Sequence, residues 1–398
     1  YDTYDIIRPQ FSPDFFEVCS AMSTRKTSNS KSLVVVQLAG GNDALNTIIP
    51  YTDSRYFDGR RNVALSQESV IKLNDELGMR PGMDTFKKFW DSGQLAIING
   101  IGYPNPNRSH FRSMDIWYTA DNENLGQEGW LGKAIRDLDP TAENVLTGVN
   151  FGRSLPRAMY AKDVPVSSVG NLDTYGLFPD IESELDREVT VNAFSRMYGG
   201  RGKDLIKDFI SQTGVNALKG ADVIRSVSGK YSSSIEYSSS AIAQQLQSIA
   251  KVICAEIGTR IYYTTYGGFD THSGLVDTHS KLWNGLSAAI GDFMDDLRLH
   301  DKHEDIIVLI WSEFGRRVVD NGAGTDHGAG GVGFLLGSSV DGGFFGEYPS
   351  LEPKYLDEGD LQFNNDFRGT YSSILEQWLD LDPVSIVGGN YEQFSLVK

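Results

Sequence analysis

The feature that most constrains the fold of this chain is a series of short apolar runs that end in glycine and polar residues. The first run, 33–38, is apolar apart from Gln37 and is followed by Gly40 and Gly41. Similar runs occur at 95–98, 260–266, 306–310 and 332–336. Short β-branched runs of this kind are typical of strands buried in a parallel sheet. We expect 332–336 to be the last strand.

Segments with helical periodicity alternate with these strands. Apolar residues recur at helical spacing in 242–257, where Gly258 is a natural stop, and in 282–297. Shorter helices are expected at 84–90 and from Ser109 through 117. Alternating strands and helices predict an α/β fold with a mostly parallel sheet covered by helices.

The chain has 398 residues, which is enough for one large domain. Residues 1–30 are polar and aperiodic, and we interpret them as an extended N-terminal arm before a domain at 31–398. Within that domain, periodicity weakens over about 121–230, which predicts a long excursion or cap. The Ser-rich stretch 226–240 is expected to be a mobile connection.

Composition excludes two classes of partner. The net charge of −17 argues against nucleic acid, whose recognition needs a basic surface. No apolar run approaches the ~20 residues of a transmembrane helix. An anionic substrate would need a local positive centre, either a metal or an arginine, to overcome the negative field of this chain.

The strongest candidates for chemistry follow predicted strands. Ligands of open α/β sheets bind outside the carboxyl ends of the strands. Asp270 and His272 follow the strand 260–266 and a pair of glycines, and two such side chains can reach one metal ion. His327 lies in a segment of five glycines and two alanines, where packing does not require a histidine. These three residues are therefore predicted to be metal ligands.

Two further acids each have two interpretations. Asp43 follows the strand 33–38, and it is either a metal-binding carboxylate or a turn aspartate that caps a helix. Glu313 follows the buried strand 306–310, where an unpaired charge would be costly. Its partner is either a metal or Arg316. Alternatively, Arg316 could hold an anionic substrate oxygen with its planar guanidinium.

Ser109 and His110 lie at a predicted helix N-terminus, where exposed amides and the helix dipole favour an anion. Ser109 is either the N-cap of this helix or a nucleophile activated by a metal. There is no Gly-x-Ser-x-Gly motif, so a serine-hydrolase triad is unsupported. A dinucleotide enzyme is excluded because no G-x-G-x-x-G turn follows the first strand.

Five motifs together resemble the DUF1501 family, in its order and spacing, from about residue 31 to the C-terminus. They are Gly40-Gly41-Asn42-Asp43, Pro104-Asn105-Pro106-Asn107-Arg108-Ser109-His110-Phe111-Arg112, Gly267-Gly268-Phe269-Asp270-Thr271-His272, Ser312-Glu313-Phe314-Gly315-Arg316 and Thr325-Asp326-His327-Gly328-Ala329-Gly330. That family is of unknown function and looks like a branch of the alkaline phosphatase-like superfamily of phosphatases and sulfatases. Its members usually carry export signals.

The resemblance implies a three-layer αβα sandwich and hydrolysis of a phosphate or sulfate ester at one or two divalent metals. By position, Asp270, His272 and His327 match the first metal site, Asp43 and Glu313 the second, and Ser109 the nucleophile. The chain departs from the superfamily enzymes after the strand 306–310. There it has Glu313-Phe314 in place of an Asp-His pair, so the second metal lacks an imidazole.

The leading hypothesis is therefore an exported hydrolase, periplasmic, cell-surface or extracellular in a bacterium. It would act on a small anionic ester or on a sulfated or phosphorylated glycan. His110 would lie at the catalytic centre, and Arg316 or Arg112 would hold the anion. Mixed oxygen and nitrogen ligands suit Zn²⁺ or Mn²⁺, whereas Mg²⁺ or Ca²⁺ would be favoured by carboxylates alone. The alternative is a catalytically silent secreted protein that binds or assembles with partners, in part through the N-terminal arm.

Overall fold

The computed structural model describes residues 31–172 and 231–398, together with seven residues between them: Asp186, Val189, Thr190, Ala193, Gly220, Val223 and Ile224. The predicted N-terminal arm and most of 173–230 lie outside the described residues.

A nine-stranded sheet forms the centre of the chain, in the order β11-β5-β10-β9-β1-β8-β6-β7, with β14 also paired to β5. Its strands are β1 (Ser32–Ala39), β5 (Leu95–Gly102), β6 (Gly148–Phe151), β7 (Ser167–Ser168), β8 (Ile261–Gly267), β9 (Ile306–Trp311), β10 (Gly331–Leu336), β11 (Gly343–Phe345) and β14 (Asn365–Asp366). Among these strands β10 alone runs antiparallel to its neighbours, β5 and β9. The expectation of a mostly parallel sheet is confirmed.

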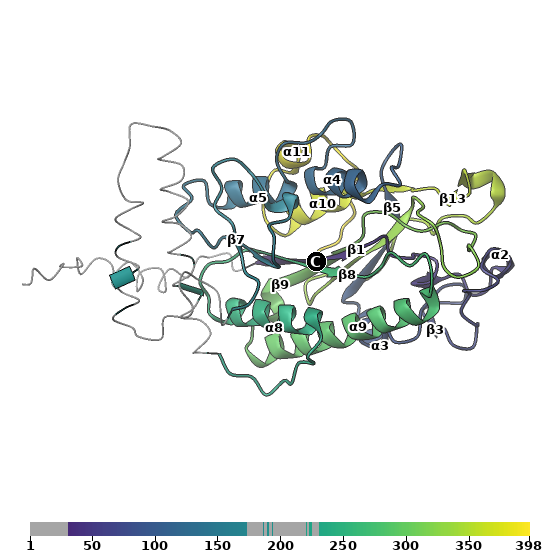
Figure 1. Cartoon of the computed structure of the whole chain (residues 1–398), viewed down its shortest axis with the longest axis horizontal. Helices are drawn as coiled ribbons and strands as arrows, with labels where there is room; N and C mark the ends of the chain where they lie inside the picture. Colours follow the sequence, from purple (N-terminus) through teal and green to yellow (C-terminus); the bar gives the residue numbers. More distant parts are fainter. Residues whose placement is uncertain are drawn as a thin grey trace, which may run out of the picture.

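Helices cover both faces of this sheet (Figure 1). One face carries α3 (Asp84–Asp91), α8 (Ala241–Cys254) and α9 (Leu275–Leu299), and the other carries α4 (His110–Thr119), α5 (Trp130–Leu138), α10 (Phe367–Gln377) and α11 (Pro383–Val387). The three-layer αβα arrangement is therefore confirmed. The apolar runs of the strands are continuous because a strand covered on both sides buries every side chain.

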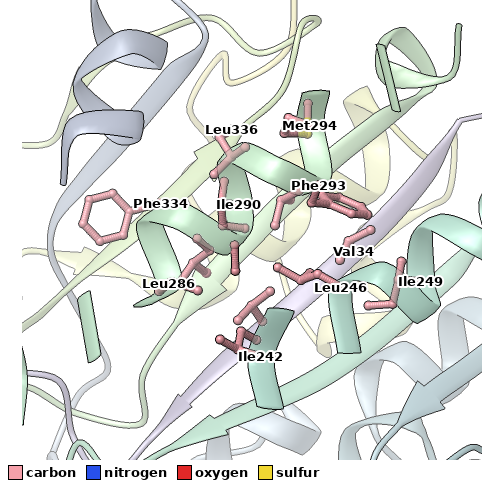
Figure 2. Close-up of a cluster of buried hydrophobic side chains, with 14 of the residues drawn as sticks. Val34, Ile242, Leu246, Ile249, Leu286, Ile290, Phe293, Met294, Phe334 and Leu336 are labelled. Carbon is pink, nitrogen blue, oxygen red and sulfur yellow. The ribbon is translucent and has the colours of Figure 1, made fainter. Parts of the chain in front are cut away.

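Alternate residues of β1 show this division. Val34 and Val36 point into the core shared with α8 and α9, whereas Leu33 and Val35 point into the core on the α4 side. Figure 2 shows the first of these cores, in which Leu246 of α8 and Ile290 of α9 pack over Val34. Burial on both faces fixes the register of β1, because a slip of one residue would exchange the two sets.

A few short elements lie outside the central sheet. They are the three-stranded sheet of β2 (Ile48–Ile49), β4 (Gly78–Met79) and β3 (Ile71–Lys72), the hairpin of β12 (Leu356–Asp357) and β13 (Asp360–Leu361), the helix α2 (Ser54–Gly59), and 3₁₀ turns at Arg157–Met159, His303–Asp305 and Pro353–Tyr355.

Two expectations differ from the structure. The segment 332–336 is not the last strand, because β11 and β14 follow it and pair with β5. These strands are too short to give a sequence signal. In addition, β6 and β7 lie within 121–230 but extend the central sheet beyond β8. This part of the expected excursion therefore belongs to the core.

The described part of the Ser-rich stretch is tied down by hydrogen bonds. The buried carboxylate of Asp296 in α9 accepts from the hydroxyls of Tyr231, Ser233 (2.5 Å) and Tyr237 (2.8 Å). Hydroxyl donors satisfy a buried carboxylate that would otherwise be costly. Residues 231–237 therefore lie against α9 and are joined to it by these hydrogen bonds.

None of the helices that the structure describes combines the length and apolarity needed to cross a membrane.

Candidate metal centre

Five polar segments meet at one edge of the sheet. The strands β1, β5, β8 and β9 all end at this edge, and each is followed by a segment that was predicted to carry chemistry. The fifth segment, 325–330, instead precedes β10. Because β10 runs in the opposite direction, its first residue lies where its neighbours end. The direction of this one strand therefore brings His327 to the same edge as Asp270.

Glycine at the end of β1 permits close packing at this edge. Gly40 has φ +123°, and a Cβ atom there would lie 2.3 Å from the backbone nitrogen of Asp270. Only glycine adopts this conformation without strain and leaves room for the neighbouring backbone. Gly40 therefore allows the backbone of Asp270 to lie directly against the end of β1.

Arg316 joins three of the segments. Its side chain is fully buried, and its guanidinium donates to Oδ1 of Asp270 at 2.6 Å. The same guanidinium donates to the carbonyl oxygens of Gly40, Gly41, Phe269 and Thr325. Burial acts to raise the pKa of Asp270, but the Arg316 guanidinium and the adjacent His327 outweigh it and lower this pKa to about 2. Asp270 is thus held as a carboxylate.

Two imidazoles face this carboxylate. The Nε2 atoms of His272 and His327 lie 3.1 and 3.2 Å from Oδ1 of Asp270 and 2.9 Å from each other. Nδ1 of His327 lies 2.7 Å from the carbonyl oxygen of Arg108, which can only accept. Nδ1 of His272 lies 3.0 Å from the carboxylate of Asp326. Both Nδ1 atoms therefore carry hydrogen, which leaves the Nε2 atom of each ring facing Asp270 as the available ligand atom.

Three lone-pair donors within hydrogen-bonding distance repel one another unless a proton or a cation lies between them. A carbonyl or carboxylate on the far nitrogen of each ring is the usual outer partner of a metal-binding histidine. Burial also lowers the pKa of His327, which disfavours its protonated form. The donor set therefore fits a divalent metal ion held by Asp270, His272 and His327.

His110, on the first turn of α4, adds a third imidazole. Its Nδ1 lies 2.8 Å from Oε1 of Glu313, and the hydrogen bond to this carboxylate raises the pKa of His110. Its Nε2 lies 3.5 Å from Oδ2 of Asp270 and is buried without a hydrogen-bond partner among the described residues. One ligand atom each from His110, Asp270 and His327 lies within 4.8 Å of the others.

The sequence left a metal or Arg316 as the partner of Glu313. In the structure Glu313 contacts His110. Its side chain is fully buried, and it accepts hydrogen bonds from His110, from the amide of Gly40 at 2.8 Å and from the hydroxyl of Ser312 at 3.1 Å. Among the described residues Glu313 makes no ion pair with Arg316, and its carboxylate contacts Nδ1 of His110, whose Nε2 faces Asp270. It orients the imidazole.

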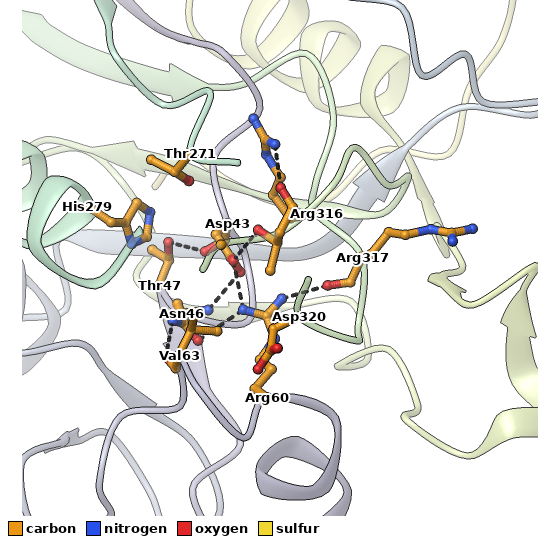
Figure 3. A network of polar contacts seen from close by, with 12 residues as sticks. Asp43, Asn46, Thr47, Arg60, Val63, Thr271, His279, Arg316, Arg317 and Asp320 are labelled. Atoms are coloured by element: carbon orange, nitrogen blue, oxygen red, sulfur yellow. Dashed lines mark hydrogen bonds and ion pairs between the residues drawn. The ribbon is translucent and has the colours of Figure 1, made fainter. Parts of the chain in front are cut away.

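Asp43 lies in a network of polar contacts that reaches Arg316 through Thr325, and Figure 3 shows this network. Its carboxylate has no solvent exposure and lies 2.7 Å from the guanidinium of Arg60. It also accepts from the amide of Asn46 at 3.1 Å and from the hydroxyl of Thr325 at 3.1 Å. This is the turn interpretation, strengthened by a buried ion pair. Arg60 is distant in sequence and has no local motif, so its role could not be anticipated.

Ser109 precedes the first residue of α4, where an N-cap was one expectation. Its side chain makes no capping hydrogen bond, and its hydroxyl has no hydrogen bond to any residue in the described part of the chain. Its backbone is extended, with φ −89° and ψ 125°. The hydroxyl is therefore exposed beside His110, next to amides that no side chain caps.

The two arginines expected to hold an anion have structural roles. Each of the three guanidinium nitrogens of Arg316 donates to the protein, as described above. Arg112 donates to Asp115 at 2.8 Å and to the carbonyls of Asn122 and Asn124, so it holds the loop after α4. Arg108 and Arg317 were not singled out from sequence, and both pair with the buried carboxylate of Asp360.

The loops around Arg316 and His327 form a continuation of β9 and β10. These two residues make an isolated antiparallel bridge. The amide of Gly315 donates to the carbonyl of Ala329, and the amide of Gly328 donates to the carbonyl of Gly315, both at 2.9 Å. The two residues are thus neighbours across a ribbon that extends past the sheet.

The model of DUF1501, described as a protein of unknown function, matches residues 213–367. The chain resembles the DUF1501 family, as its motifs predicted. The match includes Asp270, His272, Glu313, Arg316 and His327, and it begins after Asp43 and Ser109. No curated protein matches this chain.

Several solved structures are similar to the chain at low identity. The PsFucS1 sulfatase from Pseudoalteromonas sp. has 9% identity and a TM-score of 0.38, with 95% of this chain and 72% of that one covered. The C-terminal periplasmic domain of EcEptC from Escherichia coli has 8% identity and a TM-score of 0.38, with 92% of this chain and 88% of that one covered. The lipoteichoic acid synthase LtaP from Listeria monocytogenes has 10% identity and a TM-score of 0.34, with 84% of this chain and 74% of that one covered.

Proposed function

We propose that this chain is a metal-dependent hydrolase of phosphate or sulfate esters, exported from a bacterial cell, with Ser109 as its nucleophile. The observation that carries this proposal is the convergence of Asp270, His272 and His327, whose three donor atoms lie between 2.9 and 3.2 Å apart. The resemblance to DUF1501, which looks like a branch of the alkaline phosphatase-like superfamily, supports both export and ester hydrolysis.

Asp270, His272 and His327 would hold the metal ion, with Nε2 of His110 facing the same point. The mixture of one carboxylate and imidazoles suits Zn²⁺ or Mn²⁺ better than Mg²⁺ or Ca²⁺. A bound divalent ion would neutralise charge on the ester and favour ionisation of the attacking hydroxyl. Asp43 and Glu313 are engaged by Arg60 and His110, so we propose one metal ion per chain.

The first turn of α4 is suited to an ester anion. Its amides are uncapped, and the positive end of the helix dipole favours negative charge there. Ser109 sits at this turn with its hydroxyl unengaged, so it can approach phosphorus or sulfur without first breaking a hydrogen bond. His110, oriented by Glu313, lies one residue further on and can hold or release a proton at Nε2.

One observation favours the alternative, a catalytically silent protein that binds or assembles with partners. No hydrogen bond joins the hydroxyl of Ser109 to a base within the described residues. In hydrolases a nucleophile and its base are usually within hydrogen-bond reach, although such contacts are often looser without substrate.

Two measurements test the proposal. The metal content of the purified protein is determined first, and hydrolysis of p-nitrophenyl phosphate and p-nitrophenyl sulfate is then followed with Zn²⁺ or Mn²⁺. We expect bound metal, turnover of at least one ester, and loss of turnover in Ser109→Ala and His327→Ala. Ser66→Ala serves as the control, because Ser66 is also exposed and lies outside the five polar segments.

Absence of metal and of any affinity for added metal would overturn the proposal. Metal binding without turnover of either ester would instead favour the silent binding protein. Ser109→Ala with unchanged turnover would remove Ser109 as the nucleophile while leaving the metal centre intact.

A further inference from the structure

Asp360, in the hairpin of β12 and β13, is a buried carboxylate that the proposed chemistry does not use. Its side chain has no exposed surface, and it lies 2.6 Å from the guanidinium of Arg108 and 3.2 Å from that of Arg317. Arg108 precedes Ser109 in the segment after β5, and Arg317 follows Arg316 in the segment after β9. One carboxylate therefore joins two of the five segments that meet at the sheet edge.

Backbone contacts on both sides of Asp360 hold the hairpin against the ribbon. The carbonyl oxygen of Leu361 accepts from the amide of Gly330 at 2.9 Å. On the other side, the carbonyl oxygen of Glu358 accepts from the guanidinium of Arg317 at 2.8 Å. The carboxylate of Asp360 is therefore presented to Arg108 from a fixed place.

Arg108 connects this carboxylate with a proposed metal ligand. Its guanidinium binds Asp360, and its carbonyl oxygen accepts from Nδ1 of His327 at 2.7 Å. Its backbone makes no hydrogen bond with another backbone group in the described part of the chain, and residues 103–109 belong to no helix or strand. The side-chain contact with Asp360 is therefore the main restraint on the position of this carbonyl.

The second acid that binds Arg108 is a weaker restraint. Glu358 lies 3.3 Å from the guanidinium, and its side chain is 76% exposed. Water and salt screen the attraction between exposed charges, so such a pair holds a side chain loosely. Asp360 is closer to the guanidinium and is shielded from water, where the attraction is stronger.

A gain in stability does not account for Asp360. Burial raises its pKa, although both arginines act to lower it. A raised pKa means that the ionised carboxylate costs free energy on folding at neutral pH. Asp360 raises the pKa of Arg108 in turn, but this guanidinium is 38% exposed, so water screens that gain. Buried ion pairs of this kind fix positions more than they stabilise a fold.

We propose that Asp360 is a positioning residue, which through Arg108 holds the imidazole of His327 with Nε2 toward Asp270. What this orientation serves rests on the proposed function, because His327 and Asp270 are there the ligands of the metal ion. Asp360 itself contacts neither the ion nor the substrate. Without it, the carbonyl of Arg108 moves away and His327 loses the acceptor that keeps hydrogen on Nδ1.

NMR of the metal-free full chain, labelled with ¹⁵N-histidine, tests this role without metal or turnover. Nitrogen shifts, recorded at about pH 8, above the usual pKa of histidine, report which nitrogen carries hydrogen. We expect Asp360→Asn to shift His327 toward the form with hydrogen on Nε2. His272 should not change, because its Nδ1 donates to Asp326.

Arg108→Met provides a second variant that keeps the backbone carbonyl and removes the guanidinium. It should shift His327 in the same way as Asp360→Asn. The double variant should add nothing further, because both changes remove one contact. Arg108 is partly exposed, so this variant also serves if Asp360→Asn does not fold.

Metal affinity gives an independent readout. Competition for Zn²⁺ with a chromophoric chelator should show about tenfold weaker binding in Asp360→Asn. Asp115→Asn is the matched control, because Asp115 is also buried and pairs with two arginines, Arg112 and Arg157. Neither of these arginines contacts the metal centre, so the nitrogen shifts of His327 and the Zn²⁺ affinity should stay unchanged.

Unchanged nitrogen shifts of His327 in the folded Asp360→Asn or Arg108→Met variant overturn the proposal, as does an equal shift in Asp115→Asn. A loss of stability to urea with His327 and Zn²⁺ affinity unchanged leaves Asp360 a structural role only. A shift of His327 in a chain that binds no metal keeps the positioning role and rejects the metal-dependent hydrolase. The two failures are thus distinguishable.

Discussion

Nδ1 of His110 lies 2.8 Å from Oε1 of Glu313, a carboxylate with no solvent exposure. Both oxygens of this carboxylate accept hydrogen bonds from the protein, one from His110 and Gly40 and the other from Ser312. The carboxylate is thereby held against the imidazole of His110, whose other nitrogen faces Asp270. The pair therefore indicates that Glu313 acts through an imidazole.

The Glu313→Gln variant tests this role. We expect the metal content to stay at one ion per chain, while turnover falls about tenfold or more because His110 loses its charged outer partner. Elemental analysis and steady-state kinetics give the two values. Glu68→Gln, at an exposed glutamate outside the five polar segments, is the control. A fall from two ions to one would show that Glu313 is a ligand.

We expect Asp326 to increase the metal affinity of the site without being a ligand of the ion. It accepts from Nδ1 of His272 at 3.0 Å, so Asp326→Ala removes the group that fixes this ring. Removal of such outer partners typically lowers metal affinity about 10–100-fold. Competition with a chromophoric chelator measures the change, and Asp341→Ala, at an exposed aspartate elsewhere, should not alter affinity. Equal affinities in the two variants would contradict the role.

The buried ion pair of Asp43 and Arg60 is expected to contribute to folding rather than to metal binding. Asp43→Asn leaves the guanidinium of Arg60 buried without a counter-ion, which typically costs about 3–5 kcal/mol. Urea unfolding measures the free energy. The double variant Asp43→Leu, Arg60→Met should recover part of this loss, because it leaves no unpaired charge. A large loss of metal affinity with unchanged stability would restore Asp43 as a ligand.

The pair of Asp43 and Arg60 also makes the free energy of unfolding depend on pH at acidic values. Burial acts to raise the pKa of Asp43, but Arg60 outweighs it and the pKa lies below its usual value of 3.8. The unfolded chain therefore binds this proton first as pH falls, so the contribution of Asp43 is complete above about pH 5 and is lost as pH drops through the folded pKa. In Asp43→Asn the fall in unfolding free energy below about pH 5 should be shallower. An unchanged slope would exclude Asp43 as its source.

Alanine substitutions at Gly40 and Gly322 distinguish the effect of backbone strain from that of steric overlap. Gly40→Ala introduces both, because φ is +123° and the new Cβ would meet the amide of Asp270. Gly322→Ala introduces only strain, since φ is +97° and no atom lies within 4 Å. We expect Gly322→Ala to cost about 1 kcal/mol and Gly40→Ala to cost more and to weaken metal binding. Thermal unfolding and chelator competition compare them, and matching results would contradict close packing at Gly40.

Much of the site could be predicted because strand ends can be recognised in sequence. Buried runs followed by paired glycines located Asp270 and His272, and the structure brings both to His327 as expected. The same patterns predicted α3, α4 and α8 within a few residues, whereas α9 begins at Leu275, seven residues before the expected 282. Local signals of this kind arise from burial and from backbone freedom, both of which are written into a few adjacent residues.

The partners of charged residues could not be predicted in the same way. Glu313 binds His110 across 203 residues of chain, and Asp43 binds Arg60 through a turn without a recognisable motif. Likewise, nothing in 331–336 reveals that β10 runs against its neighbours. Such choices depend on which element packs beside which, so they are decided by tertiary structure.

The ribbon that joins Arg316 to His327 also makes the metal centre sensitive to chain length. Side chains on paired extended segments alternate between two faces, so a shift of one residue reverses all of them. One residue inserted between Trp311 and Arg316 would turn the guanidinium away from Asp270 while His327 kept its place. Insertions within 318–324, where the two segments are joined, would leave the pairing intact. Changes of length among related chains should therefore concentrate at the tip of the ribbon and spare its two sides.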